Sequence, residues 1–248
     1  MTAQPHEQPH EHLSEAVLRP VRGHHAFEAC VEQLATAIRL GVYPVGSALP
    51  PERDLAERLA VSRASLREAM AALRQAGLVE TTRGRGGGTV VTPRARGSFA
   101  RKAARLTAVQ RQDWLDALEF RRVVEPGAAA LAAAVTLRDA DLARLRDAHE
   151  VVAAASRPLE HRQADSRFHL TVAALSGSAR LIEAVTSVQA SLHQMLMSIP
   201  VLEANIGHSH RQHSLLVSAI VRDRPDRAHR VMEEHCDDTA ALLRGLLG

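Results

Sequence analysis

The sequence predicts a mostly α-helical protein with two parts, an N-terminal domain containing a small β-hairpin and a C-terminal all-α antiparallel bundle. Three observations lead to this prediction. Apolar residues recur at helical spacing over most of the 248 residues, and strand-like segments are confined to residues 78–91. Proline, glycine and charge without periodicity separate the two parts at residues 92–98. Aromatic residues make up only 2% of the chain, so the cores must consist of Leu, Val and Ala, as in packed helices.

The first predicted helix begins near His24 and ends at Gly41. Residues 1–22 precede it and contain several histidines among Gln, Glu and Pro but no apolar run. We therefore expect a disordered tail there and no signal peptide. The stripe of the helix that should face the core consists of Phe27, Cys30, Val31, Leu34 and Ile38.

Two short helices follow, with a tight turn between them. The first should start after the proline pair at 50–51, because proline is tolerated at a helix N-terminus and acidic residues follow it. Ser62 is predicted to cap the second helix, which runs from about 63 to 75 and stops at Gly77. The buried stripe of the second helix should be Leu66, Ala69, Met70 and Leu73.

A Gly-rich hairpin completes this domain. Residues 78–80 and 89–91 are predicted strands around a tip at 83–88, where missing side chains let the backbone and Arg85 approach a narrow groove. A helix pair with such a hairpin is a winged helix-turn-helix, which we place at residues 23–92. A phosphate-binding loop is the alternative for the glycines, but such loops carry Gly-Lys-Ser/Thr or lie between a strand and a helix.

The start of the second short helix is the predicted contact with DNA. In a helix-turn-helix this end enters the major groove, where arginine can donate two hydrogen bonds to guanine. Here the sequence places Arg63, Ser65 and Arg67. Residues 47–105 contain 12 Lys/Arg against 5 acidic residues, whereas residues 106–248 contain 16 against 18. The basic charge therefore lies where phosphates would be neutralised. An ordinary surface helix pair with a solvated hairpin is the alternative.

Residues 93–110 are predicted to be a linker and residues 111–248 a helical domain. Breaks at 136–139, 156–158, 176–178, 200 and 223–225 divide this domain into helices with short connections, which is typical of an antiparallel bundle. At Pro126 the pattern fits either a break or one long helix. No apolar stretch approaches the roughly 20 residues needed to cross a bilayer, and two isolated cysteines form no disulfide framework. A reducing cytoplasm fits this composition.

Four residues of metal-ligand type fall on helix faces that should be buried. They are Asp165, His169, His213 and His235. A carboxylate and three imidazoles in one bundle interior can bind a divalent ion, with zinc expected and nickel or manganese as alternatives. Burying each group alone would be costly, and sharing a cation relieves that cost. The alternative is that each histidine is a hydrogen-bonded core residue.

These patterns resemble the GntR family of bacterial transcription regulators, and within it the FadR-type branch with a C-terminal FCD effector domain. The matching segments of the first domain are Leu49-Pro-x-Glu-Arg-Asp-Leu-Ala56, Val61-Ser-Arg63, Leu66-Arg-Glu-Ala69 and Gly77-Leu-Val79. Those of the second domain are Arg121-x-x-x-Glu125, Asp165-x-x-Phe-His169, His213 with the apolar residues after it, and Glu234-His235.

The resemblance implies roles for particular residues. It assigns DNA contacts to Arg53, Ser62, Arg63 and Arg67, and the wing tip to residues 86–88, which include Gly86 and Gly87. Ala64 stands where the family often has Thr, and alanine cannot form a side-chain hydrogen bond, so the resemblance assigns no such contact to this position. It also implies that Asp165 and the three histidines bind a metal beside a small-molecule pocket. Arg121 resembles a pocket position that can pair an effector carboxylate, the alternative being a plain salt bridge with Glu125.

The predicted function is therefore that of a DNA-binding transcriptional regulator, expected to be a repressor and not an enzyme. The resemblance implies a homodimer on a palindromic double-stranded operator, with a small carboxylate effector, no membrane contact, and a location in the bacterial cytoplasm at the nucleoid. A metal-dependent hydrolase with a basic nucleic-acid-binding head is the alternative, but the sequence has no HExxH motif or nucleophile elbow. An architectural protein without effector control would leave the predicted buried ligands unexplained.

Overall fold

The computed structural model describes Leu18 and residues 20–21, 26–39, 42–82, 88–92 and 107–247. The chain forms two compact units, one of residues 1–105 with 241–248 and the other of residues 106–240. The predicted tail and linker fall mostly outside the described residues. The wing-tip residues Arg85, Gly86 and Gly87 fall wholly outside them.

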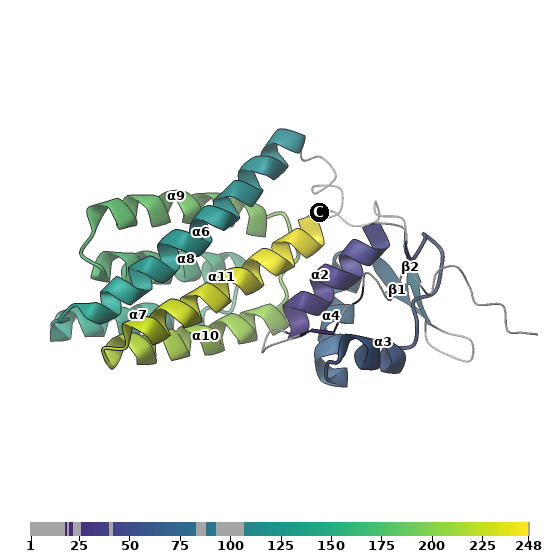
Figure 1. Ribbon diagram of the computed structural model, residues 1–248, viewed down its shortest axis with the longest axis horizontal. Coiled ribbons are helices and arrows are strands. Elements are labelled where there is room, and N and C mark those ends of the chain that lie inside the picture. Colours follow the sequence, from purple (N-terminus) through teal and green to yellow (C-terminus); the bar gives the residue numbers. More distant parts are fainter. Residues whose placement is uncertain are drawn as a thin grey trace, which may run out of the picture. The chain divides into compact units, whose positions relative to one another are not determined.

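The helices of the first unit start and stop where local sequence signals predict. They are α2 (Ala26–Arg39), α3 (Glu52–Leu59) and α4 (Arg63–Gln75) (Figure 1). Helix α3 follows the proline pair directly and ends at Ala60, which adopts a left-handed conformation with φ of 55°. The side chain of Ser62 caps α4 by accepting a hydrogen bond from the Ser65 backbone N–H at 3.0 Å. The predicted core positions of both short helices are buried.

The hairpin pairs β1 (Val79–Thr81) with β2 (Thr89–Val91) in antiparallel register. Val79 faces Val91 at the buried base, and at the other end the hydroxyl oxygens of Thr81 and Thr89 lie 2.9 Å apart. The first strand begins one residue later than predicted. The reason is that Leu78 N–H still bonds to the Leu73 carbonyl at 2.9 Å, so this residue closes the preceding helix.

The described helices of the second unit are long and joined by short connections. They are α6 (Ala108–Ala134), α7 (Asp139–Ala154), α8 (Pro158–Leu175), α9 (Ala179–Leu196), α10 (Glu203–Val221) and α11 (Pro225–Leu247), of which the last residues group with the first unit. A reciprocal capping box between Thr107 and Gln110 starts α6. This helix continues through Pro126, so the long-helix alternative is the one observed.

The bundle core is built mainly from Ala, Val and Leu. One cluster of buried residues joins α6, α7, α8, α10 and α11, with Phe168 as its fully buried aromatic, and a smaller cluster joins α6, α8 and α9. Figure 1 shows α6 and α11 crossing the bundle with α10 alongside. The predicted fold class, a winged helix-turn-helix with an all-α bundle, is confirmed. Within the described residues, no helix has both the length and the apolar character to span a membrane.

Candidate nucleic-acid interface and metal centre

The first two turns of α4 present cationic side chains. Arg63 and Arg67 are exposed, and no hydrogen bond or ion pair among the described residues engages their side chains. The first turn contains no acidic residue, and Leu66 anchors the opposite face in the core. The positive end of a helix together with two unpaired guanidinium groups favours phosphate or base-edge acceptors.

Three further predicted contacts lie in the helix pair. Ser65 Oγ lies 2.9 Å from the capping hydroxyl of Ser62, which places both hydroxyls at the start of α4. Arg53 of α3 is 74% exposed and donates to Asp54 at 3.1 Å. An exposed ion pair of this kind contributes little free energy, so the guanidinium remains available.

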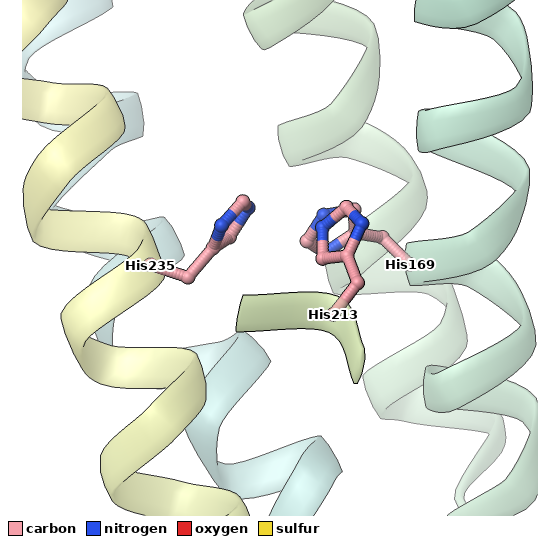
Figure 2. A group of neighbouring side chains, drawn as sticks. All are labelled: His169, His213 and His235. Atoms are coloured by element: carbon pink, nitrogen blue, oxygen red, sulfur yellow. The ribbon is translucent and has the colours of Figure 1, made fainter. Parts of the chain in front are cut away.

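Three imidazoles from separate helices meet inside the bundle (Figure 2). One ring nitrogen from each of His169 on α8, His213 on α10 and His235 on α11 lies within 4.8 Å of the others. The three residues are between 1% and 3% exposed. Both ring nitrogens of His213 are buried without a hydrogen-bond partner among the described residues. Such unpartnered nitrogens are costly in a core, and a cation between them would satisfy them.

Asp165 supplies the carboxylate of the same cluster. Its Oδ1 lies 3.7 Å from His213 Nε2, and its Oδ2 lies 4.0 Å from His169 Nε2. The carboxylate is 14% exposed, which makes it the most accessible of the four groups. The structure therefore brings together all four residues predicted as metal ligands. Three imidazoles and one carboxylate match the donor set of a first-row divalent ion.

Glu125 of α6 orients the His169 ring through the Nδ1 atom of that ring. Its Oε2 lies 2.9 Å from His169 Nδ1, which favours the proton on Nδ1 and leaves Nε2 free toward the cluster. Gln189 donates to Glu125 Oε1 at 2.6 Å. Burial alone would raise the pKa of Glu125, but the charge of Arg121, the contact with His169 and the Gln189 hydrogen bond hold that pKa below its usual range. Glu125 is thus a buried carboxylate that stays ionised.

Arg121 forms an ion pair with Glu125. This salt bridge is the alternative that we set against a role for Arg121 in binding an effector. Arg121 Nε lies 3.2 Å from Glu125 Oε2, and both side chains are 1% exposed. This pair does not use the whole guanidinium, because Nη1 is buried and has no hydrogen-bond partner among the described residues. Glu125 and Asp165 both raise the pKa of Arg121 against the effect of burial, so the side chain is charged beside the cluster.

A second relay, which the sequence interpretation missed, orients His235. Gln212 Oε1 lies 3.0 Å from His235 Nδ1, and the amide of Gln212 donates to Asp238 Oδ2 at 2.6 Å. This arrangement places the proton of His235 on Nδ1 and leaves Nε2 as the free ring nitrogen. Asp238 follows His235 by three residues, so the two share one face of α11, and this spacing could have indicated a carboxylate near the ring, though not the part played by Gln212.

We expect the metal-free protein to lose stability as the pH falls below about 6.5, the ordinary histidine value. Burial lowers the pKa of His213 and of His235 well below that value in the folded state. The unfolded chain therefore takes up protons first, so stability is present above pH 6.5 and is lost on acidification, by up to about 1.4 kcal/mol per pH unit for each histidine. Chemical unfolding measured between pH 5 and 7.5 tests this. Replacing both histidines with leucine should flatten the slope, and an unchanged slope would contradict the assignment.

A separate cavity of about 690 Å³ lies between the end of α6, α7 and the outer face of α8. Its lining includes Arg138, Asp141 and Arg144, which pair with one another, and none of the four cluster residues. Asp141 pairs with both of these arginines, and the lining residues that the structure describes include no histidine, so this cavity does not offer the donor set of the histidine cluster.

The helix pair, the hairpin and the exposed basic helix end define a DNA-binding transcriptional regulator. A model of bacterial regulatory proteins of the gntR family matches residues 27–91, and a model of the FCD domain matches residues 116–238. The chain belongs to the GntR family and carries a C-terminal FCD domain. Both domains are those of transcription regulators, which are not enzymes, so the hydrolase alternative has no support.

Two relatives that are similar over most of their length support this membership. The chain is 34% identical over 217 residues to RmpR of Mycobacterium gastri, named as an HTH-type transcriptional regulator, covering 84% of this chain and 76% of the relative. It is 30% identical over 221 residues to the Glc operon transcriptional activator of Escherichia coli strain K12, covering 84% and 85%. A solved structure titled Streptococcus agalactiae GntR matches with a TM-score of 0.46 and 26% identity over 86% of this chain and 97% of that one.

Proposed function

We propose that this regulator is a homodimeric repressor whose affinity for a palindromic operator is controlled by a small carboxylate bound near a divalent ion. The observation that supports it most is the buried cluster of Asp165, His169, His213 and His235 beside Arg121. Zinc is the ion we expect, with nickel and manganese as alternatives. DNA contacts are proposed for Arg53, Ser62, Arg63, Ser65, Arg67 and the wing residues Arg85, Gly86 and Gly87.

The donor set suggests how an effector would be held. A divalent ion supplies positive charge and, when six-coordinate, has positions beyond four protein ligands that an anionic oxygen can fill. Arg121 has a buried Nη1 without a partner among the described residues, and arginine binds carboxylates through its planar fork. Asp165 is the most exposed of the four ligands, so a small anion would approach past it.

An exposed apolar stripe on α6 supports self-association. Phe120, Val123 and Leu131 are 47%, 72% and 46% exposed, and they recur at spacings that place them along one side of the helix. A second copy of the chain is the occupant we propose, because two-fold symmetry in the protein matches a palindromic operator.

Regulation would follow from a difference in effector affinity between two arrangements of the DNA-binding domains, since only a differential affinity shifts such an equilibrium. Repression is the direction we propose for the unliganded protein. One relative is named as an activator. Acting on an operator places the protein in the bacterial cytoplasm, at the nucleoid.

A screen of small hydroxy and dicarboxylic acids by thermal shift should identify an acid that stabilises the zinc-loaded protein but not Asp165→Ala. The physical reason is that loss of one ligand removes the ion to which the acid binds. A ligand at about 100 times its Kd stabilises the folded state by about 2.7 kcal/mol, which is readily measured.

The same acid, added to a reporter strain carrying the promoter nearest the gene, shows the direction of control. Expression should rise if the protein represses. An acid that stabilises wild type and Asp165→Ala equally would show that the ion does not hold the effector.

A further inference from the structure

Arg162 is a half-buried cation on the inward face of α8. It precedes His169 by seven residues, almost two helical turns, and therefore lies on the same stripe, with Asp165 between them. Arg167 of the same helix, by contrast, points to the opposite, exposed side. The face of α8 that carries the proposed metal ligands Asp165 and His169 thus also carries the guanidinium group of Arg162. Positions 162 and 169 are about 10 Å apart along the helix axis.

The contacts of Arg162 leave its charge uncompensated. One Nη lies 3.1 Å from the sulfur of Met197, and the other donates to the Ile199 carbonyl at 3.3 Å. A thioether is a weak acceptor and a carbonyl is neutral. No ion pair among the described residues involves Arg162, whereas Arg121 and Arg122 of the same unit each face a carboxylate. Burial accordingly lowers the pKa of Arg162.

Partial solvent exposure runs along one face of α8 from Arg162 to Asp165, whereas His169 on the same face is buried. Positions 204–210 of α10 are half-buried without exception, whereas His213, further along the same helix, is 1% exposed. Asp165, between Arg162 and His169, is also partly accessible. Arg162 and Asp165 are therefore both reachable from solvent on this face of α8, and a ligand held at the histidine cluster would extend toward the guanidinium.

We propose that Arg162 binds the distal anionic group of an extended, dianionic organic acid whose first carboxylate lies at the histidine cluster. This inference rests on the proposed function and adds the class of effector. Arg121 lies beside the cluster, where its Nη1, unpartnered among the described residues, would contact the first carboxylate, so Arg162 is the cation that a second carboxylate would neutralise. An arginine fork and a carboxylate form paired, charge-assisted hydrogen bonds. A dicarboxylate with separated ends fits this spacing better than a short monocarboxylate.

Titration calorimetry on the zinc-loaded full-length protein tests the proposal, with linear dicarboxylates from succinate to suberate and the matching monocarboxylates from butanoate to octanoate. We expect one dicarboxylate to bind at least about tenfold more tightly than its monocarboxylate partner. Arg162→Met should abolish that preference and leave the monocarboxylate Kd within about twofold, whereas Arg162→Lys should keep part of it. Arg167→Ala, on the outer face of the same helix, should change neither value. Thermal melts of the ligand-free variants confirm folding.

The outcomes separate this proposal from the one it rests on. If monocarboxylates bind in a zinc-dependent way and no dicarboxylate gains affinity, the metal-held effector stands and the role of Arg162 is wrong. A preference that survives Arg162→Met overturns the role of Arg162 as well. If no acid binds the zinc-loaded protein, both proposals fall.

Discussion

Replacing Arg63 with alanine should weaken binding to the specific operator by about 1 to 3 kcal/mol, a loss of roughly 5-fold to 150-fold. Arg63 is exposed at the first position of α4, and no partner among the described residues competes for its guanidinium. A bidentate contact with guanine would be lost with the side chain, and guanine O6 and N7 would accept hydrogen bonds from water instead. Fluorescence anisotropy or mobility shift on the promoter nearest the gene measures the effect.

The pattern of losses identifies the kind of contact. Arg63→Lys keeps the charge but not the planar fork, so a base contact predicts a substantial loss in this variant too. Non-specific DNA should be bound almost as before. If binding instead weakens equally on all DNA sequences, and the slope of log K against log salt concentration falls by about 1, Arg63 contacts a phosphate. Protection of two half-sites about one helical turn apart would be the footprint of the proposed dimer.

Replacing His235 with alanine should remove the bound metal. Protein purified without chelator or affinity tag should contain about one divalent ion per chain, and the variant should contain almost none. Changing a group that only orients a ligand costs about 10-fold to 100-fold in metal affinity, so deleting a ligand should cost more. With free ion at about 1,000 times Kd, binding stabilises the folded state by about 4 kcal/mol, which corresponds to roughly 10 °C in Tm for a chain of this length.

His229→Ala is the matched control, because it is the same substitution on the same helix and His229 lies outside the cluster. Elemental analysis and thermal melts with and without a chelator give the two readouts. Metal retained at one ion per chain in His235→Ala would remove this residue from the ligand set. Equal loss of metal in both variants would point to a folding effect.

The DNA-binding helix pair could be predicted closely from sequence because its boundaries depend on adjacent residues. Proline before α3, the Ser62 hydroxyl at the start of α4 and Gly77 with a φ of 73° after it act within one helical turn. The four ligand-type residues were predicted as a set for a related reason. Helical periodicity within each segment is local, and it identified one buried face at a time.

Only the tertiary structure decided which buried faces meet and what satisfies them. Asp165 and His169 share a helix, but the approach of His213 and His235 depends on how α8, α10 and α11 pack. The hydrogen bond from Gln189 to Glu125 joins residues 64 positions apart, a separation at which sequence spacing carries no information. Local periodicity sets which side of a helix is apolar, because that follows from residues within a turn or two. Hydrogen-bond and ligand partners across the bundle follow from helix packing, which depends on all the side chains of the core at once.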